Sequence, residues 1–390
     1  MKLRRGEKIE LVIDRLSVGG RGVARHEGVV IFVPNAAPGD RLMVELSQVK
    51  KSFAEAEIVR ILEPSLHRVT PPCPVAGVCG GCTWQHVEYP EQLRQKQGLV
   101  RESLRKFSGF DVSAEDSVQP TVPSPKPFRY RNRVQLHFDR GRLGFFRKGS
   151  RELVDITDCP ITDEAIASKI PELKTSIGKN GAGRFEMLLT RDGGVTRRNA
   201  TSIDGDHVDH GGLAFSQVNT EQNEALVQAV VATVVDLLGP DQTGTIYDLY
   251  CGNGNFTFPL AKALPNSKLV GVELNIESIR IAREQSVSLG LAERINWHIQ
   301  DVGTFLTNES VPTGSILLLD PPRVGCTPDV ITALAASNVS RIVYVSCHPV
   351  TLGRDLNGLR EAGFKLRSVV PFDMFPQTDH VETLAVLERV

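Results

Sequence analysis

Asp248-Leu-Tyr-Cys-Gly-Asn-Gly-Asn-Phe256 joins a β-prone run to the first turn of a predicted helix, and this stretch decides the fold of the C-terminal half. Its glycines let the backbone approach a ligand closely. The third glycine of a dinucleotide fingerprint is missing, which disfavours a nicotinamide cofactor. Glu273 ends the next predicted strand, where a carboxylate can bond ribose hydroxyls, and Asp301 follows the third, in a position suited to an adenine edge. We therefore expect a nucleoside-bearing cofactor; a glycine-rich turn beside surface acids is the alternative.

Strands and helices alternate on both sides of this turn. The predicted strands cover residues 245–250, 268–273, 294–299, 315–320, 341–346, 365–373 and 382–389. Helical segments separate the first six, which predicts an α/β doubly wound sheet, and the last two runs are expected to pair as a hairpin. Ligands of such sheets bind at the carboxyl ends of the strands.

Further polar motifs stand at that edge of the predicted sheet. Asp320-Pro-Pro-Arg323 ends the fourth run, and Cys347 ends the fifth, two residues before Pro349. A cysteine at a strand end is either a catalytic thiol or a small buried hydrophobe, and position alone leaves both open. The segment Phe375-Pro-Gln-Thr-Asp-His-Val-Glu382 places acids and a histidine between the hairpin strands. Isolated acids in such a loop are expected to be solvated.

The N-terminal half is rich in short β-prone runs. The runs 9–13, 28–33, 41–46 and 56–62 predict a small β-barrel, followed by a helix over 91–107 and a proline-rich linker over 117–127. Residues 128–138 alternate apolar with polar side chains, which predicts a half-buried strand with Arg129, Arg131 and Arg133 on one face. Because a solvated face usually mixes charges of both signs, this strand is a candidate nucleic-acid contact.

Charge is distributed unevenly along the chain. Residues 1–160 carry 26 Lys and Arg against 19 Asp and Glu, whereas residues 161–390 carry 19 against 27. A basic first half suggests an anionic partner, and scattered solvated charge is the alternative. No run approaches the roughly 18 apolar residues of a membrane helix, and the N-terminus lacks the apolar segment of a signal peptide. We therefore expect a cytoplasmic protein without membrane contact.

Seven cysteines without an export signal disfavour a disulfide framework and favour metal ligation or catalysis. Cys73, Cys79 and Cys82 lie close together in sequence, and Cys159 lies far downstream. Four cysteines can bind zinc or an iron–sulfur cluster. Zinc sites favour two CxxC pairs, and only one is present, so the three-plus-one arrangement fits a cluster better. Zinc and unligated thiols are the alternatives.

Together these motifs resemble the RNA uridine-5-methyltransferase family, whose members form 5-methyluridine. The matching stretches are Phe215-Ser-Gln-Val-Asn219, Asp248 to Asn255, Asp320 to Arg323, Ser346-Cys347-x-Pro349 and His380-Val-Glu382. The N-terminal barrel is similar to the RNA-binding TRAM module, an OB-like fold. The resemblance implies a class I methyltransferase with a Rossmann-like doubly wound sheet over 211–390, a TRAM barrel over 1–63 and a central α+β iron–sulfur domain over 64–210.

The resemblance also implies roles for particular residues. Cys347 is expected to be the nucleophile and Glu382 the base. The residues expected to line S-adenosylmethionine and the uracil are Gln217, Tyr250, Asn255, Glu273, Asp301 and Asp320. Phe215 is a candidate to stack on the flipped base. Cys73, Cys79, Cys82 and Cys159 are expected to hold a [4Fe–4S] cluster. His348 stands where many relatives have Asn or Asp.

The expected function is formation of 5-methyluridine in RNA with S-adenosylmethionine, and the ribosomal branch, acting on 23S rRNA, is the closest resemblance. A tRNA T-loop substrate is the main alternative. A non-catalytic RNA-binding or assembly protein would need only the barrel and the arginine strand, but the presence of Cys347, Glu382 and Asp320 argues against it. A redox protein lacks a second electron-carrier motif. RNA is the expected partner, and a monomer the expected state.

Overall fold

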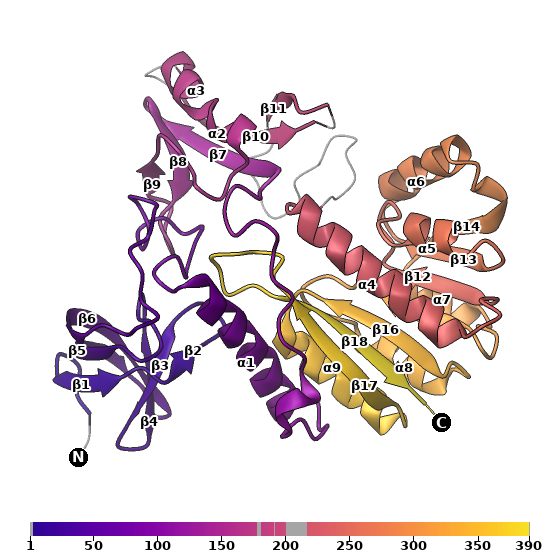
Figure 1. Ribbon diagram of the computed structural model, residues 1–390, viewed down its shortest axis with the longest axis horizontal. Coiled ribbons are helices and arrows are strands. Elements are labelled where there is room, and N and C mark those ends of the chain that lie inside the picture. The colour runs from indigo at the N-terminus through magenta and orange to yellow at the C-terminus, as the bar shows by residue number, and fades with distance from the viewer. Residues whose placement is uncertain (1–2, 178–180, 191, 200–216, 390) are drawn as a thin grey trace.

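The computed structural model describes residues 3–177, 181–190, 192–199 and 217–389, which form three β-sheets (Figure 1). In that view the N-terminal sheet lies at the lower left, the central sheet at the upper left and the C-terminal sheet at the right. Phe215, the predicted stacking residue, lies outside the described residues. Among the described helices, none combines the length and apolar character that crossing a membrane requires.

The N-terminal sheet has six strands in the order β1-β5-β6-β4-β3-β2. They are β1 (Lys8–Val12), β2 (Arg15–Leu16), β3 (Gly22–His26), β4 (Val29–Val33), β5 (Arg41–Val49) and β6 (Phe53–Glu63). Ile9 and Leu11 alternate with exposed residues of β1 and join the core of this sheet. The strands β2 and β3 were not predicted. β2 has only two residues, and a tight turn at Gly19 and Gly20, with φ values of 90° and 76°, joins it to β3.

The central sheet has the strand order β11-β10-β7-β8-β9. Its elements are β7 (Arg133–Asp139), β8 (Arg142–Phe146), β9 (Leu153–Asp155), α2 (Glu164–Ala167), α3 (Ile170–Ser176), β10 (Ala182–Leu189) and β11 (Val195–Asn199). Val134 and Leu136 of β7 are buried with Phe185 of β10, which confirms the apolar face predicted for that strand. β7 begins at Arg133 instead of 128, because the φ of 55° at Arg129 interrupts the extended backbone.

The C-terminal sheet has the strand order β14-β13-β12-β15-β16-β18-β17. Its strands are β12 (Thr245–Leu249), β13 (Lys268–Glu273), β14 (Ile295–Ile299), β15 (Ile316–Leu319), β16 (Arg341–Ser346), β17 (Lys365–Phe372) and β18 (Glu382–Glu388). The first five in this order pair in parallel, and β18 is antiparallel between β16 and β17. The predicted doubly wound sheet and its closing hairpin are therefore confirmed.

Helices alternate with these strands. They are α4 (Thr220–Leu238), α5 (Thr257–Ala263), α6 (Ile276–Ser288), the short η2 (Ala292–Arg294), α7 (Val302–Asn308), α8 (Pro328–Ala336) and α9 (Pro349–Glu361). Every residue of β15 is buried, as expected for a central parallel strand covered on both faces. The carboxyl ends of the parallel strands meet at one edge of the sheet, and the candidate site is built there.

Helix α1 (Tyr89–Phe107) packs against this sheet, although it precedes the central sheet in the chain (Figure 1). Val100 and Leu104 of α1 share an apolar core with Leu352 of α9. A Cβ added at Gly353 would lie 3.0 Å from the Ser103 carbonyl, so the glycine lets the two helices approach closely. The sequence analysis assigned residues 64–210 to the central domain, whereas α1 packs with the C-terminal unit.

The predicted linker over 117–127 covers the outer edge of β17. After α1 and the short η1 (Glu115–Ser117), the Gln119 N–H donates to the Val369 carbonyl at 2.9 Å. The Val122 N–H donates to the Pro371 carbonyl at 2.8 Å. The segment thus satisfies backbone groups that an edge strand would otherwise expose.

Residues 373–381, which we call the β17–β18 loop, leave the C-terminal sheet toward the other two sheets; they form the yellow loop near the centre of Figure 1. All of its residues are buried except Phe375 and His380, which are half-buried. The expectation that acids in this loop are solvated is therefore wrong, because neighbouring segments cover it.

Candidate active site and cysteine pocket

Cys347 and Glu382 meet at the carboxyl end of β16. Ser346 is the partner of Thr383 in the antiparallel pairing of β16 with β18. One further step in this register places Cys347 opposite Glu382. Two residues that the sequence analysis assigned to the chemistry are thus brought together by strand pairing.

The turn after Cys347 explains the unusual histidine at 348. Pro349 begins α9, where the N–H that proline lacks is not needed. His348 caps the helix, because its Nδ1 accepts a hydrogen bond from the Thr351 N–H at 3.4 Å. This capping role is the one that Asn and Asp fill at helix N-termini.

Glu382, Asp320 and Arg323 all act electrostatically on Cys347. Glu382 is only 3% exposed, and burial raises the pKa of its carboxyl to about 7. Burial, together with the Glu382 and Asp320 carboxylates, raises the pKa of the Cys347 thiol to about 12. Burial and the nearby Glu382 raise the pKa of Asp320 well above its ordinary value. Arg323 lowers the pKa of both Cys347 and Glu382, so added positive charge in this pocket favours the thiolate.

Neighbouring strands of the sheet supply the acidic and thiol groups of this edge. Asp248 lies on β12, Glu273 ends β13, Asp320 follows β15, Cys347 follows β16 and Glu382 begins β18. The predicted motifs therefore converge because their strands are adjacent.

The glycine turn after β12 is held by Glu273. The Gly252 N–H donates to one carboxylate oxygen of Glu273 at 3.2 Å, and the Asn275 N–H donates to the other at 2.8 Å. Tyr250, Gly252 and Gly254 have φ values of 65°, 55° and 91°. The two glycines adopt this left-handed backbone at little cost, whereas Tyr250 adopts it at a cost.

Asp248 is buried beneath this turn. Its Oδ2 accepts a hydrogen bond from the Thr257 hydroxyl at 2.5 Å. Its Oδ1 is also buried and has no hydrogen-bond partner among the described residues. Burial raises the pKa of this carboxyl to about 7. The group is therefore an acceptor that a donor on a ligand could satisfy.

The remaining predicted cofactor residues lie on three segments of the chain. Asp301 caps α7 by accepting a hydrogen bond from the Thr304 N–H at 2.9 Å. Asn255 exchanges side-chain hydrogen bonds with Asn223 of α4 at 2.9 and 3.1 Å. Gln217 lies just before α4. The N-terminal end of α4 is thus linked to the glycine turn.

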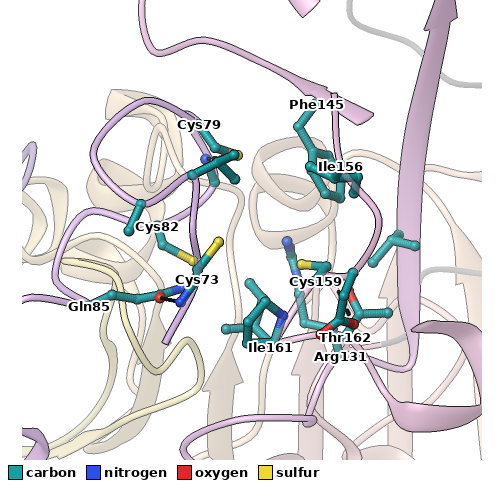
Figure 2. A pocket seen from close by; sticks show the side chains of 16 residues that line it. Cys73, Cys79, Cys82, Gln85, Arg131, Phe145, Ile156, Cys159, Ile161 and Thr162 are labelled. Carbon is teal, nitrogen blue, oxygen red and sulfur yellow. Dashed lines mark hydrogen bonds between the residues drawn. The ribbon is translucent and has the colours of Figure 1, made fainter. Parts of the chain in front are cut away.

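Cys73, Cys79, Cys82 and Cys159 line one pocket between the cysteine loop (residues 73–84) and the central sheet. Figure 2 shows the sulfur atoms of Cys73, Cys82 and Cys159 facing the space between these two parts of the chain. All four are free thiols. Cys159 thus lines the same pocket as the other three despite its distance in sequence, and a shared role as cluster ligands stays a prediction.

The other groups that line this pocket are mainly apolar, and the polar ones are Gln85, Arg131, Asp158 and Thr162. Burial raises the pKa of the Cys82 thiol to about 12 and also raises that of Cys73 and Cys79. In the described parts of the chain, no three metal-binding side chains lie close enough together to hold one ion. Burial thus disfavours the thiolate form of Cys73, Cys79 and Cys82 in this pocket.

Comparison with known proteins gives the family. A family model described as tRNA (uracil-5-)-methyltransferase matches residues 207–390, and a TRAM domain model matches residues 2–59. An uncharacterised RNA methyltransferase of Bdellovibrio bacteriovorus is 44% identical over 98% of this chain and 95% of its own length. A 23S rRNA (uracil(1939)-C(5))-methyltransferase of Acidithiobacillus ferrooxidans is 31% identical and is matched over 97% of each chain.

The chain belongs to the RNA uracil-5-methyltransferase family. One solved structure, that of Pyrococcus abyssi tRNA (uracil-54, C5)-methyltransferase in complex with S-adenosyl-L-homocysteine, is similar over 97% of this chain and all of that one. The TM-score is 0.73 and the sequence identity 25%. The family resemblance and the class I α/β fold with an N-terminal TRAM domain are therefore confirmed.

The three arginines predicted to contact RNA have protein neighbours in this uracil-5-methyltransferase. Arg129 pairs with Asp158 at 2.8 Å, and Arg133 pairs with Glu186 at 3.4 Å. Arg131 lines the cysteine pocket (Figure 2). They do not form one strand face, because only Arg133 lies within β7. Their contact with RNA stays a prediction.

Sequence reasoning assigned no role to two groups of this methyltransferase. Arg323 lowers the pKa of both Cys347 and Glu382, and its place directly after a strand-ending Asp-Pro-Pro was an available signal. Asp379 is buried and bonded to segments far away in sequence, and its polar surroundings in the chain gave no sign of this.

Proposed function

We propose that this enzyme transfers a methyl group from S-adenosylmethionine to carbon 5 of a uridine in 23S rRNA. The observation that carries the proposal is the position of Cys347 opposite Glu382 in a buried pocket beside Arg323. The 31% identity to a 23S rRNA enzyme over 97% of both chains supports the ribosomal substrate. A tRNA uridine is the second candidate, favoured by the substrate of the Pyrococcus abyssi enzyme.

The glycine turn is suited to hold S-adenosylmethionine, with Glu273 placed for ribose hydroxyls and Asp301 for the adenine edge. Tyr250, Asn255 and Gln217 complete the proposed set. A Cβ at Gly252 would meet open space, which indicates room beside the turn, and the unsatisfied Oδ1 of Asp248 lies beneath it. When bound, this cofactor supplies an electrophilic methyl group on a positively charged sulfur.

Cys347 is the proposed nucleophile, because carbon 5 of uracil is too weak a nucleophile to take a methyl group unaided. Its thiolate forms a bond to carbon 6, and the displaced π electrons move onto the ring as an enolate. Carbon 5 then carries the electron pair that accepts the methyl group. The target base must leave its stack to reach this buried thiol.

Glu382 is the proposed base that completes the reaction. It takes the proton from the methylated carbon 5, the electrons of that bond restore the ring double bond, and the carbon 6–sulfur bond breaks. Cys347 is thereby returned as a thiolate. A carboxyl with a pKa of about 7 can accept this proton and release it to solvent near neutral pH. Arg323 already opposes the rise in the pKa of this thiol, which lies at about 12, and a cationic cofactor beside it would lower that pKa further.

The four pocket cysteines are proposed to hold a [4Fe–4S] cluster. A single zinc ion needs its ligands within one small sphere, whereas a cluster takes one sulfur at each of four separate irons. The spread of the thiols around the pocket fits the second case. The buried Nε of Arg131 lacks a hydrogen-bond partner in the described structure, and it faces the place where thiolate charge would gather. When bound, the cluster would join the cysteine loop to the central sheet covalently.

RNA binding is proposed at the groove between the N-terminal sheet and α1. Basic side chains line it from both sides: Arg15, Arg21 and Arg25 from the sheet, and Arg94, Arg101, Arg105 and Lys106 from α1. Phe32 and Phe53 lie among them. Interleaved basic and aromatic groups suit a single-stranded backbone with exposed bases. Val350, three residues after Cys347, borders the same groove.

The test uses 5-fluorouridine-substituted fragments of 23S rRNA and of tRNA, with S-adenosylmethionine. Fluorine cannot leave carbon 5 as a cation, so a covalent protein–RNA adduct should survive denaturation. Cys347→Ala should abolish the adduct, and Glu382→Gln should accumulate it even with unsubstituted RNA. An adduct with tRNA alone would refute the ribosomal substrate. Absence of any adduct from folded, cofactor-bound protein would refute the mechanism.

A further inference from the structure

Asp379 joins three parts of the molecule that lie far apart in sequence. One carboxylate oxygen accepts a hydrogen bond from the Gly19 N–H, in the turn of the N-terminal sheet, at 2.7 Å. The other accepts from the Thr83 hydroxyl, in the cysteine loop, at 3.1 Å. The Asp379 N–H donates to the same hydroxyl at 3.2 Å. With only 8% of its surface exposed, this aspartate is a buried junction.

Gln377 strengthens the junction two residues earlier. Its carbonyl accepts hydrogen bonds from the Thr83 and Trp84 N–H groups, both at 3.0 Å. Its side chain and backbone exchange hydrogen bonds with Gln92 of α1 at 2.9 and 3.0 Å. Gln377 has a φ of 69°, which an L-residue adopts at a cost. These bonds therefore fix one conformation of the β17–β18 loop.

The start of the loop is anchored by a buried ion pair. Lys96 of α1 binds the carboxylate of Asp373, and both side chains are fully buried. Lys96 also donates to the Phe375 carbonyl at 3.0 Å. The loop is thus held at both ends, by α1 near its start and by the cysteine loop near its end.

The junction lies a short distance along the chain from both chemical sites. Thr83 directly follows Cys82, and Asp379 stands three residues before Glu382. His380 stands between Asp379 and Glu382 in the sequence. Its Nδ1 lies 3.4 Å from a guanidinium nitrogen of Arg323, the cation that lowers the pKa of Cys347 and Glu382. So short a segment leaves little freedom, and any displacement at Asp379 changes where Glu382 enters β18 opposite Cys347.

We propose that Thr83 and Asp379 are positioning residues for the step in which Glu382 removes the carbon 5 proton. This inference rests on the proposed roles of Cys347 and Glu382. Proton removal needs the carboxylate aimed at one carbon, whereas thiolate addition depends on the turn after β16. Among the described residues no hydrogen bond joins that turn to Thr83 or Asp379, and the influence of Asp379 on His348 is electrostatic. Removing hydrogen bonds at Asp379 therefore slows removal of the carbon 5 proton and leaves addition of the thiolate to carbon 6 unchanged.

The test compares two substitutions of one residue. Thr83→Val keeps the shape of the side chain and removes both hydroxyl hydrogen bonds to Asp379; Thr83→Ser keeps the hydroxyl and is the matched control. For Thr83→Val we expect kcat to fall about 10- to 100-fold, with KM for RNA falling in parallel so that kcat/KM changes little, because the slowed step follows adduct formation. The covalent adduct should form at the wild-type rate on unsubstituted RNA, break down slowly and accumulate. Thr83→Ser should restore breakdown to within a few-fold of wild type.

Three outcomes would overturn the proposal. They are wild-type breakdown in Thr83→Val, an equal loss in Thr83→Ser, or a loss of adduct formation as large as the loss of breakdown. If Thr83→Val does not fold, Asp379→Asn takes its place in the test, because it keeps the side-chain size and replaces one acceptor with a donor. Slow adduct breakdown with normal adduct formation supports the proposal, and wild-type breakdown refutes it. Failure of the wild-type enzyme to form an adduct with 5-fluorouridine RNA would instead refute the proposed function.

Discussion

Lowering the pH from 8 to 6 should slow breakdown of the covalent RNA adduct about tenfold, because Glu382 must be ionised to take the carbon 5 proton. Burial raises the pKa of this carboxyl to about 7. Its ionised fraction then falls from about nine-tenths at pH 8 to about one-tenth at pH 6. A solvent-exposed glutamate would stay ionised across this range, and the rate would be flat.

Adduct breakdown can be followed apart from adduct formation. The adduct is formed on unsubstituted RNA with excess enzyme at pH 8, the pH is jumped to a series of values, and the surviving adduct is measured on denaturing gels. Formation should rise with pH, because the Cys347 thiol must ionise and burial raises its pKa to about 12. Breakdown should level off above about pH 8.

Arg323→Gln supplies the control for the electrostatics. Arg323 lowers the pKa of Glu382, so its loss should move the midpoint of the breakdown profile to higher pH. A breakdown rate that does not change between pH 6 and 8 would refute the assignment of Glu382 as a buried base. A midpoint that stays fixed in Arg323→Gln would refute the influence of that cation.

Other perturbations address stability and RNA binding. In the folded protein the pKa of the Glu382 carboxyl is raised from 4.5 to about 7, so folding favours its protonated form and this contribution to stability is lost as the pH rises through that range. Glu382→Gln carries no charge, so it should raise the free energy of unfolding at pH 8 by on the order of 3 kcal/mol in urea denaturation. Lys96→Met leaves the buried Asp373 carboxylate without its cation and should lower the free energy of unfolding by about 3–5 kcal/mol. The double variant, Lys96→Met together with Asp373→Leu, should recover most of that loss. Removal of iron by a chelator should lower the melting temperature together with the visible absorbance, and an unchanged melting temperature would contradict a structural cluster. Arg25→Ala and Arg105→Ala should each reduce the slope of log affinity against log salt by about 1, as measured by RNA titration, whereas unchanged slopes would exclude the groove.

The C-terminal sheet could be predicted from sequence because its strands carry strong local signals. The predicted bounds of β13 and β16 agree with the structure to the residue. Parallel strands buried on both faces are continuous apolar runs, and helices separate them. The meeting of Cys347 with Glu382 was also predictable, since both stand at strand ends on the same edge of the sheet.

Features that depend on distant partners were not predictable in this way. Asp379 looks like a loop residue until the turn at Gly19, 360 residues away, is placed beside it. Arg129, Arg131 and Arg133 alternate in sequence like one strand face, but a left-handed residue at 129 and nearby acids give them different surroundings. Local periodicity describes an element correctly only where no outside contact overrides it.

The packing of α1 against α9 and the strands of the C-terminal sheet has a consequence for biosynthesis. The ribosome makes α1 long before the elements that cover its apolar face, and the whole central sheet emerges in between. The catalytic unit therefore completes its core only when β17 and β18 have been translated. Because β18 carries Glu382, nascent chains interrupted earlier have neither a finished core nor the base, and they expose apolar surface that chaperones bind. A fragment beginning at residue 211 would lack α1 and would expose the apolar surface that α1 covers, so the catalytic unit is not separable from the N-terminal half.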